Sequence, residues 1–158
     1  MDEEIEVFAP LYLLTSTEEC WKCHKPQNVI ALGTHQIVDD SQIFGDSADT
    51  TDLLLLSNIE SMPPEVLQYI VQRYPRFMER YSDTAEASYY ANTCECGANF
   101  GDFYLFLEPG GAFFPDTDEA AKEIKYHKMP FSGTLRFACS YSHGIGDLIL
   151  AHATKEEA

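Results

Sequence analysis

Basic residues are scarce in this sequence. It contains 10 lysines and arginines against 26 aspartates and glutamates, which gives a formal net charge of −16. Nucleic-acid binding usually depends on a basic stripe that displaces counterions from phosphates, and the scattered Arg73, Arg76 and Arg80 hardly form one. A nucleic-acid partner is therefore disfavoured. The same net charge attracts basic proteins and speeds their encounter, although acidic residues also simply keep a surface solvated.

Long apolar segments are absent as well. No stretch approaches the roughly 20 apolar residues that a membrane-spanning helix requires. The chain begins Met1-Asp2-Glu3-Glu4, which is acidic where a secretory signal would be basic, and no apolar signal segment follows. We therefore expect a cytoplasmic protein that makes no membrane contact. In the reducing cytosol, paired cysteines more often hold a metal ion than form disulfides.

Signatures of known catalytic sites are also missing. The sequence has no His-Glu-x-x-His pattern, no Gly-Lys-Ser/Thr phosphate loop and no zinc-deaminase motif. Residues 142–147 contain serine, histidine and aspartate, but the members of a catalytic triad usually come from different elements. We therefore expect that the protein is not an enzyme. The histidines outside the cysteine motifs are scattered: His35, His127, His143 and His152.

The apolar content that is present suffices for a folded core. The chain has 158 residues, of which 45% are hydrophobic and 13% aromatic, and a domain of this size buries roughly 68–70% of its unfolded surface. We predict a single α+β domain over residues 1–158 with a mainly antiparallel sheet. The acidic residues 39–52 predict a loop. The predicted strands are Leu11–Leu14, Asn28–Leu32, Leu53–Leu56, Glu86–Thr93, Asp102–Leu107, Leu135–Tyr141 and Leu148–Leu150.

Two short helices are predicted between these strands. The first begins near Ser61, which can cap it, and ends before Pro75. The second runs from Asp116 or Thr117 to about Lys128, because acidic residues in its first turn and lysines later match the helix dipole. The apolar residues of the first helix recur with helical spacing and predict a buried stripe: Val66, Leu67, Ile70, Val71 and Tyr74.

Four of the five cysteines form two close pairs, each in a turn between apolar runs. Cys20 and Cys23 are separated by two residues, and Cys94 and Cys96 by one. Zinc prefers four ligands in a tetrahedron, and thiolates suit it well. We predict that Cys20, Cys23, Cys94 and Cys96 bind one structural Zn²⁺ ion. Four thiolates saturate the ion, so it would stabilise the fold and activate no water.

At these motifs the chain resembles the zinc-ribbon family, in which two β-hairpin knuckles hold a structural zinc. The resemblance covers residues 11–32 and 86–107, and the 70 residues between Cys23 and Cys94 form a large insert. Cys94-Glu95-Cys96-Gly97 keeps the glycine of the family's Cys-x-x-Cys-Gly turn but has one spacer residue fewer. Zinc ribbons occur in proteins of many functions, so the resemblance implies a metal ion and no particular activity.

Other roles for the cysteines stay open at this point. The four residues could be ordinary buried cysteines, or Cys20-x-x-Cys23 could be a redox motif, although such a motif favours a helix N-terminus and a strand is predicted here. Cys139 alternates with apolar residues and is expected in the core. Cys139, His143 and His24 are the candidates to replace a ligand of the shortened second pair.

We expect a non-enzymatic binding protein that engages a protein partner, plausibly a basic one. The aromatic residues around the second cysteine pair are either covered by the insert, which is the favoured alternative, or form an exposed patch that binds a partner. Phe113 and Phe114, after a double-glycine turn, are the candidates for such a patch, and the acidic residues Asp46, Asp49 and Asp52 are the other candidates for the contact surface. Small acidic proteins of this kind include immunity proteins and inhibitors. The alternative is a zinc-ribbon accessory factor of nucleic-acid machinery, which would need a local basic face.

Overall fold

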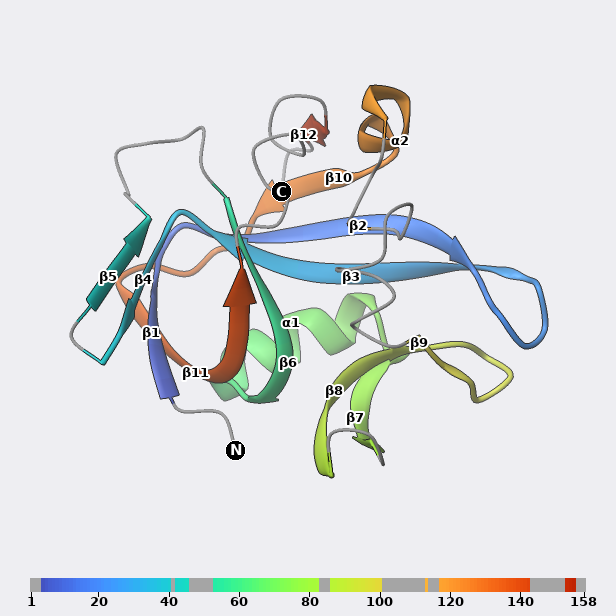
Figure 1. Cartoon of the computed structure of the whole chain (residues 1–158), viewed down its shortest axis with the longest axis horizontal. Coiled ribbons are helices and arrows are strands. Elements are labelled where there is room, and N and C mark those ends of the chain that lie inside the picture. The colour runs from blue at the N-terminus through green and yellow to red at the C-terminus, as the bar shows by residue number, and fades with distance from the viewer. Residues whose placement is uncertain are drawn as a thin grey trace.

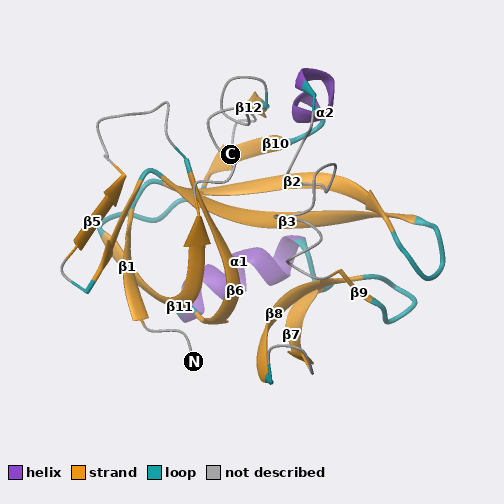
Figure 2. Cartoon of the chain, in the orientation of Figure 1, coloured by secondary structure: helices purple, strands orange, loops and turns teal. Residues whose placement is uncertain are grey.

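Strands make up most of the structure, and two α-helices accompany them (Figure 1, Figure 2). The computed structural model describes residues 4–40, 42–45, 53–82, 86–100, 113, 117–142 and 153–155. The strands are β1 (Glu4–Phe8), β2 (Leu11–Glu19), β3 (Pro26–Thr34), β4 (Gln36–Asp39), β5 (Gln42–Gly45), β6 (Leu54–Ser61), β7 (Phe77–Ser82), β8 (Ala87–Thr93), β9 (Asn99–Phe100), β10 (Lys125–Lys128), β11 (Thr134–Ser142) and β12 (Thr154–Lys155). The helices are α1 (Pro64–Arg73) and α2 (Asp118–Lys122). Within the described residues, neither helix has the length and apolar character to cross a membrane.

The strands form one hydrogen-bonded network whose pairs are antiparallel, except for the parallel pair of β10 and β12. The main path runs in the order β12-β10-β2-β3-β6-β11-β1-β4-β5, and β7, β8 and β9 branch from it through β6. This confirms the predicted α+β fold with a mainly antiparallel sheet and two helices. The predicted strands Leu11–Leu14 and Asn28–Leu32 lie inside the long hairpin of β2 and β3.

Both faces of the central strand β3 are buried. Ile30 and Leu32 belong to one hydrophobic cluster, to which α1 also contributes, whereas Val29 and Ala31 belong to a second cluster that contains the cysteine turns. Residues 53–56 alternate between the same two clusters. Leu53 precedes β6, and the other three leucines of the run lie in it. A continuous apolar run fits here because both faces of the strand are covered, as the sequence predicted.

Strand β6 changes its partner along its length. Residues Leu54–Leu56 pair with β3, but Ile59 pairs with Tyr90 of β8. Asn58, which lies between these two segments, has a positive φ of 48°. The change of partner carries the chain from the main sheet to the β7-β8-β9 branch, so β3 and β8 lie next to each other without a continuous ladder between them.

Helix α1 begins later than predicted. Its N-cap is Pro63, and no side chain caps it. Ser61, the predicted cap, is instead the last residue of β6. The helix ends at Arg73, before Pro75, as predicted. Its buried residues are Val66 and Ile70, whereas Val71 is 38% exposed, so the buried stripe is narrower than the apolar pattern suggested.

Two other sequence predictions need correction. Helix α2, capped by Thr117, ends at Lys122, and residues 125–128 form β10 because they pair with the free edge of β2. The predicted loop 39–52 contains the end of β4 and all of β5, which form a hairpin in which Asp39 pairs with Gln42 and Asp40 takes a positive φ of 50°. The predicted strands 102–107 and 148–150 lie outside the described residues.

Candidate metal site

The first cysteine turn, Cys20–Lys25, joins β2 to β3. The backbone N–H of Cys20 donates to the carbonyl of Lys25 at 2.9 Å, and the N–H of His24 donates to the carbonyl of Cys20 at 2.9 Å. His24, the residue directly after the second cysteine, has a φ of 64°. Inside the turn, the N–H of Lys22 lies 3.4 Å from the Cys20 sulfur, as expected of an amide that stabilises a thiolate.

The second cysteine turn, Cys94–Ala98, joins β8 to β9 and repeats this plan with one residue fewer. The N–H of Cys94 donates to the carbonyl of Ala98 at 2.8 Å, and the N–H of Gly97 donates to the carbonyl of Cys94 at 2.9 Å. Gly97 follows the second cysteine and has a φ of 93°. The two turns thus share a layout despite their different spacing, and His24 occupies the position that glycine holds in the second turn.

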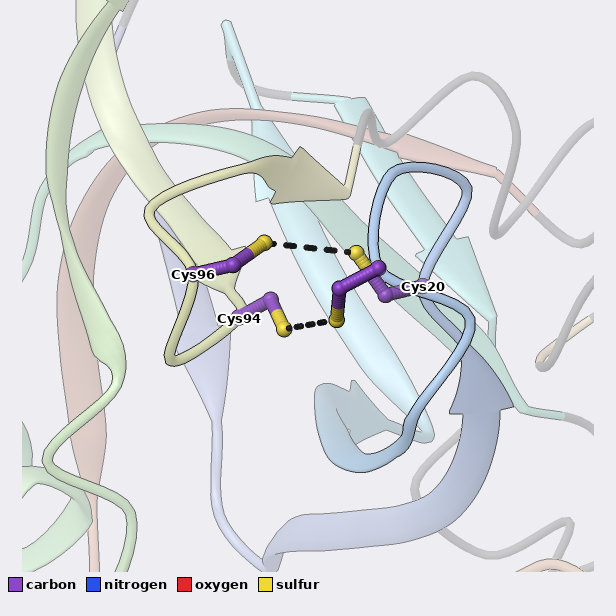
Figure 3. Close-up of side chains that lie close together, drawn as sticks. Cys20, Cys94 and Cys96 are labelled. Carbon is purple, nitrogen blue, oxygen red and sulfur yellow. Dashed lines mark hydrogen bonds between the residues drawn. The ribbon is translucent and has the colours of Figure 1, made fainter.

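The two turns face each other and bring four sulfurs together (Figure 3). The Cys20 and Cys96 sulfurs are 3.7 Å apart, and the Cys23 and Cys94 sulfurs are 3.4 Å apart. All four lie within 4.8 Å of one another. A tetrahedral ion with metal–sulfur bonds of about 2.3 Å separates its sulfurs by about 3.8 Å. The arrangement therefore fits one ion with a ligand pair from each turn, and all four cysteines are free thiols.

Burial and hydrogen bonds make the four thiols unequal. Cys20 and Cys94 are fully buried, Cys23 is half-buried and Cys96 is exposed. Burial is the largest influence on Cys20 and opposes its ionisation, but hydrogen bonds from the backbone of Cys23 and Lys22 and from the neighbouring thiols lower the pKa of Cys20 to about 6. The largest influence on Cys94 is the backbone of Cys96, which favours the thiolate. Burial and the thiol–thiol hydrogen bonds outweigh it and raise the pKa of Cys94 to about 12.

The opposite pKa shifts of Cys20 and Cys94 indicate that the cluster favours one thiolate over several. One thiolate forms readily because its neighbours donate hydrogen bonds to it, but each further negative charge is opposed by the first. A divalent cation removes that repulsion, and binding it releases the remaining thiol protons. The donor set therefore suits a soft divalent metal ion such as zinc.

Asn92 holds the strands that carry the two turns together, and the sequence analysis did not identify it. Its side-chain oxygen accepts from the N–H of Ile30 at 2.8 Å, and its side-chain nitrogen donates to the carbonyl of Ile30 at 3.0 Å. The amide thus substitutes for a strand neighbour where β6 has left β3. The sequence offers one signal of this role. Asn92 lies in a predicted strand, where asparagine is usually depleted, two residues before Cys94.

The other predicted ligands lie apart from the sulfur cluster or outside the described residues. Cys139 is buried in the first hydrophobic cluster with α1, whereas Cys20 and Cys94 belong to the second. His24 turns its Nδ1 to Glu19 Oε1 at 3.3 Å. His143 lies outside the described residues.

The predicted partner-binding residues are only partly described. Phe113 is fully buried and packs in the second hydrophobic cluster, so it supports the cysteine turns from within the core and forms no exposed aromatic patch. Its burial corrects the prediction of Phe113 as a contact residue and agrees with the other alternative, in which these aromatic residues are covered. Phe114, Asp46, Asp49 and Asp52 lie outside the described residues.

Comparisons with protein-family models, with curated proteins and with solved structures found no match to this chain.

Proposed function

We propose that the protein is a non-enzymatic binding protein held together by one structural Zn²⁺ ion, which Cys20, Cys23, Cys94 and Cys96 bind in a zinc-ribbon-like pair of knuckles. The observation that carries the proposal is the convergence of four sulfurs within 4.8 Å. They come from two turns that are more than 70 residues apart in the chain, since Cys23 and Cys94 differ by 71 positions. Ordinary buried cysteines have no reason to meet in this way, and two of the four are not fully buried.

A bound ion would stabilise the fold by cross-linking distant segments. Closing a loop of about 70 residues removes roughly 4 kcal/mol of chain entropy from the unfolded state, on the loop-closure estimate used for disulfides. Cys20 and Cys94 belong to the second hydrophobic cluster, so the ion would also fix the edge of that cluster. With four thiolate ligands the ion has no open position for water or substrate, which supports a structural role.

Metal analysis of the purified protein tests the zinc proposal. We expect one zinc per chain in the wild type, and loss of zinc in the Cys94→Ser/Cys96→Ser variant. Cys139→Ala provides the matched control, because Cys139 is buried in the other cluster and should not affect the zinc content. Substitution with Co²⁺ would give the absorption spectrum of a tetrahedral thiolate site. A wild type that binds no metal after refolding with zinc would refute the site.

The expected partner is a protein, and the formal charge of −16 favours a basic one. Asp46, Asp49 and Asp52 stay candidates for its contact surface. An affinity purification with the full-length protein, repeated at high salt, tests this expectation. Loss of the partner at high salt supports an electrostatic interface, and a partner retained equally at both salt concentrations argues against it.

The alternative, an accessory factor of nucleic-acid machinery, has one observation in its favour. The N–H and hydroxyl of Thr93 both donate to the carbonyl of Arg76, at 3.1 and 2.6 Å, so Arg76 lies beside the second cysteine turn. The first turn carries Lys22 and Lys25. Binding of an oligonucleotide that weakens in an Arg76→Glu variant would favour this alternative.

A further inference from the structure

The tip of the first cysteine turn exposes the chain's one tryptophan. Trp21, between the ligands Cys20 and Cys23, is 66% exposed. The other large hydrophobic side chains that the described residues expose lie on different elements: Ile43 on β5, Val71 on α1 and Tyr81 on β7. Figure 1 shows the turn between β2 and β3 projecting at the same end of the molecule as the turn between β8 and β9. Among the described residues, Trp21 is therefore the exposed large hydrophobic side chain that lies in a cysteine turn.

One hydrogen bond orients the indole ring. Its Nε1–H donates to the backbone carbonyl of Asn99, on the other side of the metal site, at 2.9 Å. This bond uses the only polar group of the side chain, so what the ring presents to the surroundings is apolar. Ordering a side chain on binding lowers affinity, and the hydrogen bond to Asn99 provides part of that ordering before a partner binds. Tryptophan is also among the residues that contribute most to binding energy at protein interfaces.

Two lysines, Lys22 and Lys25, lie in the same turn as Trp21, whereas the nearest exposed carboxylates belong to Glu19 at the end of β2 and Glu95 in the second cysteine turn. Lys22 and Lys25 are exposed, and within the described residues neither ammonium group forms an ion pair. His24 is already paired with Glu19. Two unpaired cations beside an apolar ring thus stand out on a chain of net charge −16. They complement carboxylates on a partner.

We propose that the tip of the two cysteine turns is a docking surface for another protein, with the indole of Trp21 as its central contact. The partner would offer an apolar pocket edged with carboxylates that face Lys22 and Lys25. This inference rests on the proposed zinc-held turns, which fix the position of the ring. A polyanion such as single-stranded nucleic acid fits less well, because two lysines are too few to form a phosphate-binding stripe and the net charge of −16 repels phosphates.

The experiment compares variants of the full-length, zinc-loaded protein. The partner is first isolated with the wild type and purified, and its affinity for each variant is then titrated. We expect Trp21→Ala to weaken binding by at least about 30-fold, as for a central interface residue. Lys22→Glu/Lys25→Glu should weaken it by about 5–50-fold, as for charge pairs at an interface. Tyr81→Ala, which removes a comparably exposed aromatic ring on β7, is the matched control and should leave the affinity unchanged.

The zinc content of the variants distinguishes a partner-binding role of Trp21 from a structural role in holding the turns. Trp21→Phe loses the hydrogen bond to Asn99 but keeps an aromatic ring, so it should retain zinc and bind the partner better than Trp21→Ala. If Trp21→Phe and Trp21→Ala both lose zinc, the ring stabilises the turns and the proposal fails. If the wild type itself lacks zinc, the proposed function fails first. A zinc-loaded Trp21→Ala variant that binds the partner normally overturns the docking surface alone.

Trp21 fluorescence gives a direct readout, since no other tryptophan contributes to it. Binding of the purified partner should shift the emission to shorter wavelength and protect the indole from acrylamide quenching. A poly-dT oligonucleotide at the same salt concentration should produce neither change. If the oligonucleotide does so with micromolar affinity, or if the wild type retains no protein at all, the assignment of a protein partner is wrong.

Discussion

The side-chain amide of Asn92 makes two hydrogen bonds with the backbone of Ile30, which precedes it by 62 residues. Both residues are buried, with 4% and 1% of their surfaces exposed. Strand β6 pairs with β3 only as far as Leu32, so Ile30 would otherwise have unpaired backbone groups inside the protein. Asn92 satisfies them, and because it lies two residues before Cys94 it also fixes the approach of the second cysteine turn to the first.

Replacing Asn92 should therefore destabilise the protein strongly. Asn92→Ala leaves the N–H and carbonyl of Ile30 buried without partners, and we expect the free energy of unfolding to fall by about 2–4 kcal/mol. Asn92→Asp keeps the volume but sets a carboxylate against the carbonyl of Ile30, so it should be destabilising too. Asn28→Ala, at an exposed position of β3, is the control and should change stability by less than about 0.5 kcal/mol.

Urea denaturation in saturating zinc measures these changes. Zinc affinity, measured by competition with a chelator, should fall in Asn92→Ala as well, since the two turns would no longer be held at the same distance. Unchanged stability in both Asn92 variants would show that β3 and β8 are held together by other contacts.

The residue after the second cysteine of each turn has a positive φ, and this predicts opposite effects of two glycine changes. Gly97→Ala should destabilise the protein by about 1–2 kcal/mol through its backbone alone, because an added Cβ would meet no atom within 4 Å. His24→Gly should be more stable than His24→Ala by a similar amount. Both variants lose the contact between His24 Nδ1 and Glu19 Oε1, so its loss cancels in the comparison. Equal stability of His24→Gly and His24→Ala would contradict the expectation.

Phe113 provides a test of core packing. Its ring is fully buried beside Cys20 and Cys94, so Phe113→Ala should lower the free energy of unfolding by about 3–5 kcal/mol. Tyr81→Ala, which removes a ring that is 60% exposed, should lower it by less than about 1 kcal/mol. Thermal or urea denaturation distinguishes the two cases. A stable Phe113→Ala variant with weakened partner binding would instead restore this ring to a contact surface.

Tyr141 should make stability depend on pH in the alkaline range. Burial, and then the hydrogen bond from its hydroxyl to Asp39 Oδ2 at 2.8 Å, raise the pKa of Tyr141 from 10.0 to about 12. Between these values the folded protein keeps a proton that the unfolded chain has lost, so this contribution to stability is complete below pH 10.0 and disappears as the pH approaches about 12. The stability difference between wild type and Tyr141→Phe should therefore shrink over this range.

Denaturation at a series of pH values measures that difference. Asp39→Asn keeps a hydrogen-bond acceptor but removes the charge, so it should reduce the alkaline loss of stability. Parallel pH curves for the wild type and Tyr141→Phe would mean that the phenol ionises equally in the folded and unfolded states.

Sequence reasoning succeeded where the pattern is local. Residue period and spacing predicted three features correctly: the β2-β3 hairpin, the buried leucines 53–56 that contact the two clusters alternately, and the two cysteine turns. It failed where the partner strand decides the structure. Residues 125–128 were predicted as helix, but they form a strand because the edge of β2 is available to them.

The contacts that position the candidate site were likewise beyond the sequence. Asn92 was missed because its role depends on β6 leaving β3, which no local pattern reports. Phe113 stayed a candidate for an exposed patch because its neighbours in the chain do not reveal the cluster that surrounds it. In both cases the deciding information comes from segments that are distant in the chain.

The separation of the ligand pairs has a consequence during protein synthesis. A ribosome releases the first cysteine turn while the second, which is 71 or more positions later, does not yet exist. In the proposed zinc site, two thiols alone cannot fill the coordination sphere of the ion, so the nascent hairpin keeps unligated thiols until residue 96 has emerged from the exit tunnel. Newly made chains should therefore be most vulnerable to oxidation in that interval, and ample zinc would protect them only once translation has passed the second turn.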